Sequence, residues 1–237
     1  MPNIFDINTT LFTLWGYQMS YLEFFGTVAN IWCVWLTAKN KILCWPIGII
    51  GVIFYLFLFY QIRLYSDLVE QAYFFATSFF GWYLWLNAKH AKEQGNKNRR
   101  LAVTANGAAI NATYIAIVIF GTAAMGYFMA NIHIIFPKYF PEPASYPYLD
   151  AFTTVMSFVA QFLLTKKKLE SWFLWIVVDI IGIGLYYVKG VKFISAEYLL
   201  FLIIAIKGFL EWRKELIANK YEQGIGSGKI LPVSQRS

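Results

Sequence analysis

Two tryptophans and an aspartate are spaced so that they share one face of a predicted helix. Trp172, Trp175 and Asp179 stand in an apolar run that continues to Tyr187 and is long enough to cross a bilayer. With Gly182 they follow i, i+3, i+7 and i+10 spacing, which places them on the same side of a helix. A carboxylate inside a membrane segment is costly, and beside aromatic rings it suits a flat ligand that is cationic or forms hydrogen bonds.

The same residues also have a purely structural interpretation. Trp172 would then belong to the interfacial aromatic belt, Trp175 would pack in lipid or between helices, and Asp179 would bond to a neighbouring helix. This stretch alone does not separate the two interpretations, so the remaining sequence has to be considered.

The composition of the 237-residue chain indicates an integral membrane protein. Hydrophobic residues make up 59% of the sequence, charged residues only 14%, and the mean hydropathy is +0.52. Cys33 and Cys44 lie in or beside apolar segments without the spacing of a metal site, and are interpreted as packing residues. His90 and His133 lie far from Asp179 in the sequence and form no metal-binding motif, so neither an enzyme nor a cofactor is expected.

The hydropathy pattern predicts an all-α integral membrane protein with seven transmembrane helices. A short interfacial or surface segment over residues 1–20 precedes them. The expected spans are residues 21–38, 43–60, 67–87, 110–130, 148–164, 172–188 and 195–212. We also expect a basic cytoplasmic loop over 88–109, a proline-rich outer loop over 131–147 and a cytoplasmic tail over 213–237.

Basic residues are concentrated in alternate connections. With the N-terminus outside, the outer connections carry only Arg63, Lys138, Lys189 and Lys192, and the other lysines and arginines of the connections lie inside. This positive-inside distribution predicts an outer N-terminus and a cytoplasmic C-terminus. It also explains the net charge of +7 through topology and contact with anionic lipid, without a nucleic acid partner.

The sequence contains an internal repeat with an offset of 127 residues. The most distinctive aligned pairs are Tyr21 with Tyr148, Trp45 with Trp172, Glu70 with Glu197, Gly81 with Gly208 and Trp85 with Trp212. Each copy, 21–87 and 148–212, holds three spans, and the single span at 110–130 between them makes the two copies parallel. The predicted architecture is a 3+1+3 repeat like that of SWEET-type transporters, with a substrate site between the repeats near the midplane.

The two copies differ in polarity at a few positions, as an asymmetric ligand would require. These positions are Asp179 opposite Val52, Trp175 opposite Gly48, Gln71 opposite Tyr198 and Gln161 opposite Val34. By contrast, Glu70 and Glu197 match each other near the outer ends of their helices, where helix capping or snorkelling is favoured over ligand contact. Trp82 and Trp85 lie near a cytoplasmic helix end and are expected to be interfacial anchors.

Several motifs follow one another along the chain in a family-like order. They are Trp45-Pro-Ile-Gly48; Asp67 to Trp85 with Glu70, Gln71, Ser78 and Gly81-Trp82-Tyr-Leu-Trp85; Glu170-Ser-Trp172-Phe-Leu-Trp175 with Asp179; and Gly208-Phe-Leu-Glu-Trp212. Together they resemble the PnuC family of bacterial vitamin transporters from Tyr21 to Lys214. The resemblance implies facilitated uptake of nicotinamide riboside across the inner membrane, without ion or ATP coupling and with retention by cytoplasmic phosphorylation. It also implies a SWEET-like fold with one extra helix, and a homotrimer.

Nicotinamide riboside is a planar pyridinium cation joined to a ribose, and the residues suit it. The candidate substrate-binding residues are Trp172, Trp175, Asp179, Gln71, Thr153 and Trp45. The first two indoles are expected to stack on or flank the ring, the aspartate to offset its charge or bind a hydroxyl, and the glutamine and threonine to hydrogen-bond the amide or ribose. Trp45, the repeat counterpart of Trp172, has packing or the interfacial belt as its alternative.

No lysine or arginine stands in the middle of a predicted span. Lys207 lies within the span 195–212, but it is near enough to the inner face for its ammonium group to reach the interface. A phosphorylated nucleotide would want such a cation, so the riboside is favoured over the mononucleotide. Transport of thiamine or riboflavin, which related family members accept, remains an alternative. A SWEET-like sugar transporter, in which aromatic residues stack on sugar rings, is another.

Overall fold

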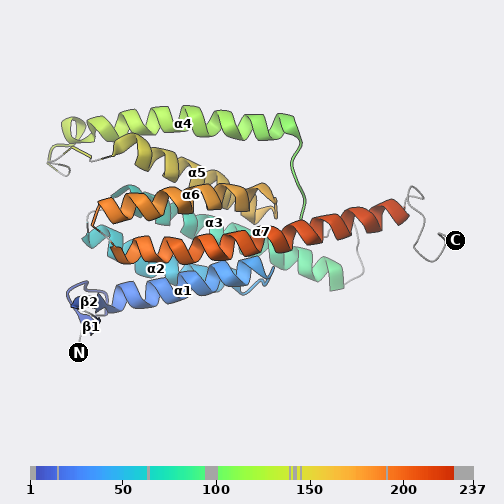
Figure 1. Ribbon diagram of the computed structural model, residues 1–237, viewed down its shortest axis with the longest axis horizontal. Helices are drawn as coiled ribbons and strands as arrows, with labels where there is room; N and C mark the ends of the chain where they lie inside the picture. The colour runs from blue at the N-terminus through green and yellow to red at the C-terminus, as the bar shows by residue number, and fades with distance from the viewer. Residues whose placement is uncertain are drawn as a thin grey trace.

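The computed structural model describes residues 4–14, 16–62, 65–93, 101–138, 140, 143–144, 146–190 and 192–226. This part of the chain forms a short β-hairpin and seven helices that lie side by side along the long axis of the molecule (Figure 1). The strands are β1 (Thr10–Leu14) and β2 (Tyr17–Ser20). The helices are α1 (Tyr21–Ala38), α2 (Cys44–Gln61), α3 (Tyr65–Glu93), α4 (Ala108–Ile135), α5 (Pro147–Thr165), α6 (Glu170–Val188) and α7 (Lys192–Gly226).

Each helix begins within three residues of the start of an expected span, but α3, α4 and α7 run well past the expected ends. Among the described residues, α2, α4, α5, α6 and α7 are long and apolar enough to cross a membrane. α1 and α3 are not in this group. Both carry buried polar side chains, such as Thr27 on α1 and Glu70 and Gln71 on α3, which lower their hydropathy while facing the interior.

The N-terminal segment forms an antiparallel hairpin, which the sequence pattern did not predict. Its turn contains Gly16 with φ of 84°, a conformation that glycine adopts without steric cost. Ser20 and Glu23 form a capping box at the start of α1, with the Glu23 N–H donating to Ser20 Oγ at 3.2 Å. The Tyr17 hydroxyl donates to Glu23 Oε1 at 2.5 Å, and burial together with this carboxylate raises the pKa of Tyr17 above its ordinary value. The hairpin and the first turn of α1 are thereby joined.

Six helices form a closed ring. Their contacts run from α1 to α2, α3, α5, α6 and α7 and back to α1. Among the described helices, α4 packs on α5 alone and lies at one side of the molecule (Figure 1). Val118 of α4 is buried against α5, whereas Ile115 and Phe120 are exposed, as expected for a helix that faces lipid over most of its surface.

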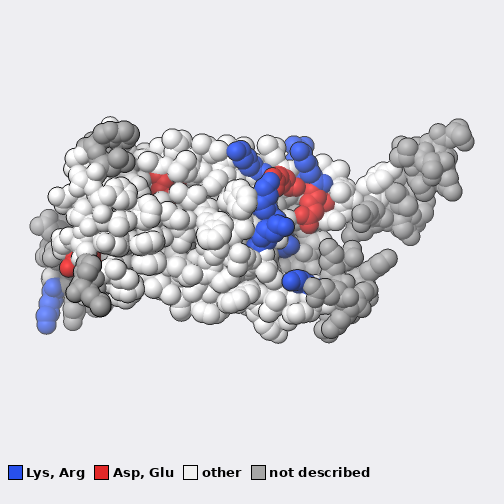
Figure 2. Space-filling view, turned by 90° about the horizontal axis from the view of Figure 1, so that it is seen from below, with Lys and Arg blue, Asp and Glu red and all other residues white. Residues whose placement is uncertain are grey.

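The two ends of the ring differ in charge. We call the end formed by residues 39–43 and 166–169 the basic end, and the opposite end, which carries the β-hairpin, the hairpin end. Figure 2 shows a cluster of basic and acidic side chains at the basic end and a broad, almost uncharged surface between the two ends. This distribution is suited to an apolar bilayer core between two polar interfaces.

The two helix connections at the basic end have the same backbone conformation. Asn40 and Lys167, which are 127 positions apart, have φ of 54° and 52°. The residues that follow, Lys41 and Lys168, donate their N–H groups to the preceding helix at 2.9 and 3.0 Å. A left-handed conformation is uncommon for a residue other than glycine, so the two connections use the same specific turn to end a helix.

Residues 101–106 fold back against the basic end. The Thr104 N–H donates to the Lys167 carbonyl at 3.1 Å, and the Thr104 carbonyl accepts from Leu169 N–H at 2.9 Å. Val103 is buried, and the Asn106 N–H donates to the Glu170 carboxylate at 2.6 Å. The segment belongs to the expected cytoplasmic loop 88–109, of which residues 94–100 lie outside the described residues.

Candidate functional site

A cavity of about 150 Å³ lies inside the ring of six helices. All six ring helices contribute to its lining, and no lining residue comes from α4. At roughly 10–15 Å³ for each water-sized sphere, the cavity has room for on the order of ten water molecules. Most of its lining is apolar, as in many ligand pockets.

Trp45 and Trp172 line the cavity near the basic end, because each lies in the first turn of a helix that starts there. Both are buried, and each indole packs on a glycine of a neighbouring helix. A Cβ atom on Gly81 would lie 2.2 Å from Trp45 Cη2, and one on Gly208 would lie 2.7 Å from Trp172 Cζ2. Such distances are shorter than any contact between non-bonded carbon atoms, so only glycine lets the indole rings lie this close to the neighbouring helices.

A second pair of indoles packs behind the first. Trp85 lies edge-to-face on Trp45 at 5.4 Å, and Trp212 lies edge-to-face on Trp172 at 5.5 Å. Trp85 is buried and its Nε1 donates to the Thr165 carbonyl at 3.1 Å. The expectation that Trp85 is an interfacial anchor is therefore wrong, because its ring belongs to the core at the basic end.

Trp175 and Gln71 also line the cavity. The Trp175 indole is partly buried and packs edge-to-face on Phe74 of α3, with ring centres 5.9 Å apart. Gln71 is buried on the same helix as Phe74. The structure thus brings an aromatic ring from the second half of the chain and an amide from the first half to one space.

Two buried carboxyl groups from neighbouring helices face the cavity. Asp179 of α6 and Glu197 of α7 are each 2% exposed, and the two carboxyls interact electrostatically. Within the described residues, Asp179 Oδ2 and Glu197 Oε1 have no hydrogen-bond partner. Glu197 Oε2 accepts a short hydrogen bond from the Tyr55 hydroxyl, which lies 2.7 Å from Thr27 Oγ1. One oxygen of Glu197 is therefore held in place while the other is left open.

Asp67 and Glu70 of α3 add two further buried carboxyl groups to the lining. Asp67 accepts a hydrogen bond from the Tyr186 hydroxyl. The expectation that Glu70 and Glu197 cap or snorkel at helix ends is wrong, because both are buried inside the ring. Among the described residues that line the cavity there is no lysine, arginine or histidine.

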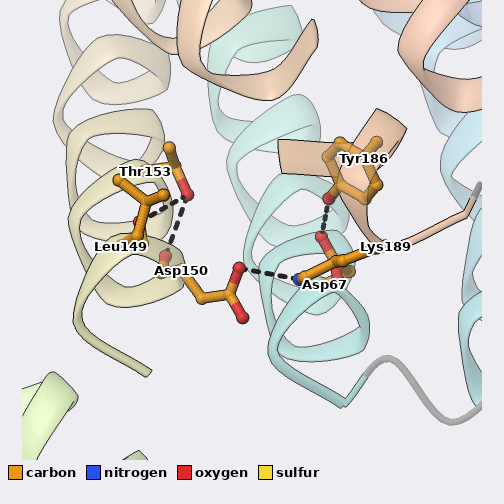
Figure 3. Close-up of polar contacts among 6 residues, drawn as sticks. All are labelled: Asp67, Leu149, Asp150, Thr153, Tyr186 and Lys189. Carbon is orange, nitrogen blue, oxygen red and sulfur yellow. Dashed lines mark hydrogen bonds and ion pairs between the residues drawn. The ribbon is translucent and has the colours of Figure 1, made fainter. Parts of the chain in front are cut away.

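Thr153 is not among the residues that line the cavity. Its hydroxyl donates to carbonyls of its own helix, those of Leu149 at 3.2 Å and Asp150 at 2.9 Å. Figure 3 shows these two hydrogen bonds beside the ion pair that joins α5 to the end of α6, in which Lys189 Nζ lies 2.7 Å from Asp150 Oδ1. The other five predicted site residues all line the cavity.

The sequence pattern missed Asp67, Tyr55 and Tyr198, which line the cavity as well. Tyr198 packs against Gly182, where a Cβ atom would lie 2.5 Å from its ring. The sequence feature that could have identified Asp67 and Glu197 is the high cost of placing an acid in a membrane helix. It applies to these two residues as much as to Asp179. Distance from a helix end was a poor guide to burial.

Comparison with known proteins agrees with this architecture. A family model described as nicotinamide mononucleotide transporter matches residues 20–214. The nicotinamide riboside transporter PnuC of Escherichia coli is 29% identical over 212 residues, covering 83% of this chain and 87% of that protein. The riboflavin/roseoflavin transporter RibM of Streptomyces davaonensis is 24% identical, covering 87% of this chain and 91% of that protein.

A solved structure, the crystal structure of the vitamin B3 transporter PnuC, superposes with a TM-score of 0.66. It is 25% identical in sequence and covers 84% of this chain and 83% of that one. The resemblance inferred from the tryptophan motifs is confirmed by these matches. The family model and each of these relatives are named as transporters, so the chain is a multi-pass membrane transporter and not an enzyme, and it belongs to the nicotinamide mononucleotide transporter family.

Proposed function

We propose that the chain takes up nicotinamide riboside across the bacterial inner membrane by facilitated diffusion, without coupling to ions or ATP. The observation that carries the proposal is the cavity enclosed by both halves of the chain. The described residues of its lining supply indole rings and carboxyl groups but no basic side chain. Relatives that are named nicotinamide riboside transporters and align over most of their length support the choice of substrate.

The chemistry of the lining fits this vitamin. A pyridinium ring is flat and positively charged, so the faces of Trp172 and Trp175 attract it and the Asp179 carboxylate offsets its charge. Trp45 closes the same space from the first half, and Gln71 offers an amide that both donates and accepts hydrogen bonds. The Thr153 hydroxyl, which bonds to its own helix, is left out of this site.

The riboside is favoured over the mononucleotide by charge. A phosphate group that leaves water needs a cationic partner or several donors, and the part of the lining that the structure describes offers no lysine, arginine or histidine. The family description names the mononucleotide, whereas these residues favour a ligand without a phosphate.

We further propose seven membrane spans arranged as a SWEET-like 3+1+3 repeat, with bundles at 21–87 and 148–212 and a linking helix at 110–130. The matching turns at Asn40 and Lys167 and the closed ring of six helices support this arrangement. The positive-inside distribution supports an outer hairpin end and a cytoplasmic basic end. A homotrimer embedded in lipid accords with the large apolar surface that α4 presents outside the ring.

Riboflavin is a second candidate substrate. The similarity to RibM, a riboflavin/roseoflavin transporter that aligns over nearly its full length, is the observation that favours it. Riboflavin shares a flat ring and a hydroxylated chain with the riboside but carries no positive charge. Because the cavity is lined by acids, riboflavin is the less favoured of the two candidate substrates.

The test is calorimetric titration of the purified, detergent-solubilised protein with nicotinamide riboside, the mononucleotide, riboflavin, thiamine and glucose. We expect the riboside alone to bind at micromolar or better, and Asp179→Ala and Trp175→Ala to weaken it. Thr153→Val is the matched control and should bind like the wild type. If the protein binds only another ligand of this set, that ligand replaces the riboside as the proposed substrate. If the folded protein binds none of the five, the proposal is refuted.

Uncoupled transport needs its own measurement. Protein reconstituted in liposomes should equilibrate labelled riboside across the membrane without a gradient of protons or sodium. Because uptake in this mechanism follows only the riboside gradient, ionophores should leave its rate unchanged. If the riboside accumulates inside the liposomes above its outside concentration, and ionophores abolish this accumulation, transport is coupled to an ion gradient.

A further inference from the structure

The N-terminal β-hairpin has no place in the site described above. Apart from Ser20 it precedes the residues that the family model matches, and none of its described residues lines the cavity. Figure 1 shows it at one end of the molecule, beside the start of α1. It nevertheless contacts helices from both halves of the chain. A segment that contacts both halves resists their separation, so its role follows from what it holds together.

Tyr17 of the hairpin connects α1 to α7. Its hydroxyl donates to Glu23 Oε1 in the first turn of α1 at 2.5 Å. Its ring stacks on Phe193 in the first turn of α7, with ring centres 6.1 Å apart and planes inclined by 17°. α1 belongs to the first half of the chain and α7 to the second, and the two helices pack directly on each other in the ring. One side chain therefore spans the contact between the halves at the hairpin end.

The residues before the hairpin are bonded to the end of α2. The side chain of Gln61 donates to the Phe5 carbonyl at 2.7 Å and accepts from the Ile7 N–H at 2.9 Å. Ile7 packs against a buried cluster that contains Leu58 of α2 and Ile194 of α7. This apolar cluster thus joins the same two halves that Tyr17 connects.

Inside the ring, α2 and α7 are also linked by a hydrogen bond. In the described structure they are not neighbours, because α1 lies between them, yet the Tyr55 hydroxyl of α2 donates to Glu197 of α7. Gln61 lies about 9 Å beyond Tyr55 along α2, and Phe193 about 6 Å before Glu197 along α7. The N-terminal segment therefore holds, at the end of the ring, the same pair of helices that this bond holds within it.

We propose that the N-terminal segment is a clamp, formed by Phe5, Ile7 and Tyr17, that keeps the hairpin end of the ring closed. A transporter exposes its cavity to the two sides in turn, so each end has to open at some stage. Separation of α1 from α7 at the hairpin end requires the Tyr17 ring to leave Phe193. The clamp thereby sets how often the cavity opens to the side on which the hairpin lies, whichever vitamin is carried.

The clamp is built to release α7 and to stay on the first half. The hydrogen bonds of Tyr17 and Ile7 go to Glu23 and Gln61, which both belong to the first half. The contact with Phe193 is a ring stack, and Tyr17 is 42% exposed. Apolar contacts have no fixed direction, and one half-exposed stack is weak enough to break and form again in every transport cycle.

The test uses Cys33, a native thiol in the cavity lining, as a reporter of opening. In a Cys44→Ala background, a small membrane-impermeant cationic methanethiosulfonate is added to membrane vesicles of each orientation, and the rate of Cys33 modification is measured. Tyr17→Ala should raise this rate by about 2- to 10-fold from the hairpin side, as expected for the loss of one aromatic stack. The rate from the side of the basic end should not rise.

Phe12→Ala is the matched control. Phe12 lies on the other strand, is exposed to a similar degree, and packs edge-to-face on Phe24 of α1 at 5.7 Å. Its loss removes an aromatic contact within the first half only, so the modification rate should stay within about 2-fold. Phe193→Ala should act like Tyr17→Ala, and the double variant should add little, because both remove the same contact.

The exposed position of Phe12 also identifies the vesicles. In protein that carries Cys33→Ala and Cys44→Ala, Phe12→Cys should react with the impermeant reagent only in vesicles that present the hairpin end to the medium. The side from which each Cys33 rate is measured is thereby known.

A reversible cross-link provides a second measurement. Tyr17→Cys and Phe193→Cys are joined by a short bis-methanethiosulfonate in protein that carries Cys33→Ala and Cys44→Ala. Riboside uptake should fall by about 10-fold or more when the link forms and recover when it is reduced, because the hairpin end can no longer open. The same link between Phe12→Cys and Phe24→Cys lies within the first half and should leave uptake unchanged.

Three results would overturn the clamp. One is an equal rate of Cys33 modification in Tyr17→Ala and Phe12→Ala, including no modification in either. Another is an equal rise from both sides of the membrane in Tyr17→Ala, which would mean a general loosening of the fold. The last is full uptake by the protein that is cross-linked between positions 17 and 193. Absence of riboside uptake by the wild type would instead refute the proposed function, and the Cys33 rates would still test the clamp.

Discussion

Substitution of Gly81 by alanine should displace the indole of Trp45. The new Cβ atom would lie 2.2 Å from Trp45 Cη2. Carbon atoms in contact are at least about 3.5 Å apart, so the ring or the helix has to move by about 1.3 Å. Forced overpacking of this kind costs about 1–3 kcal/mol in proteins.

Alanine also favours a helix over glycine by up to about 1 kcal/mol, which would mask some of this cost. Gly184→Ala on α6 is therefore the matched control, because no described atom other than its chain neighbours and its own helix backbone lies within 4 Å of a Cβ there. Both variants gain the helix preference, and only Gly81→Ala meets the indole. The free energy of unfolding of Gly81→Ala should be lower than that of Gly184→Ala by about 1–3 kcal/mol.

The assay is thermal or denaturant unfolding of each variant in one detergent, followed by riboside titration of the folded fraction. The nearest atoms to the new Cβ are Cη2, Cζ2 and Cζ3 of Trp45, all in the ring that phenylalanine lacks. The double variant with Trp45→Phe should therefore be less destabilised than the sum of the two single variants. Equal stability of Gly81→Ala and Gly184→Ala would refute the packing argument.

Three further predictions concern polar contacts. Lys189→Met should destabilise the protein by up to about 3 kcal/mol in thermal unfolding, because Asp150 would be left partly buried without its partner, and adding Asp150→Asn should recover some of the loss. Lys39→Ala should change the unfolding free energy by less than about 1 kcal/mol, since its ion pair with Glu211 is exposed to water; a larger loss would contradict this view. Thr153→Val should keep riboside affinity within about 2-fold, because an affinity change as large as one lost hydrogen bond would require ligand contact.

The helices were predictable because their apolar runs are long and are separated by charged or proline-rich segments. Their far ends were not, since hydropathy falls where charged residues begin while the helix continues. α3 runs on to Glu93 and α7 to Gly226 through residues such as lysine, glutamate and alanine, which favour helices in water. The β-hairpin was missed because its strands are short and only partly apolar.

The face that carries Trp172, Trp175 and Asp179 was predictable from helical spacing, and the structure does turn it toward the cavity. Burial at the hairpin end was not, because it depends on segments far apart in the chain. Tyr17 of the hairpin stacks on Phe193 at 6.1 Å, so the start of α7 is covered and Glu197 lies deeper than its place in the helix suggests. For Thr153, no pattern in the sequence showed that its hydroxyl would bond back to its own helix.

The two joins between the halves of the ring differ at the basic end. Where α3 meets α5, the buried Trp85 Nε1 donates to the Thr165 carbonyl, and beside it Thr104 is bonded through its backbone to Lys167 and Leu169 of the α5–α6 connection. Where α7 meets α1, the contacts at that end are side-chain bonds from Lys39 to Glu211 and from Asn40 to Glu215, and the ion pair is open to water and salt.

A transporter that releases its ligand at the basic end has to separate a pair of these helices. The join between α1 and α7 is the one that ordinary ionic strength weakens, so opening is expected there. α3 and α5, which the buried Trp85–Thr165 hydrogen bond joins, would then stay together. Residues 101–106 are bonded to the α5–α6 connection and would move with it.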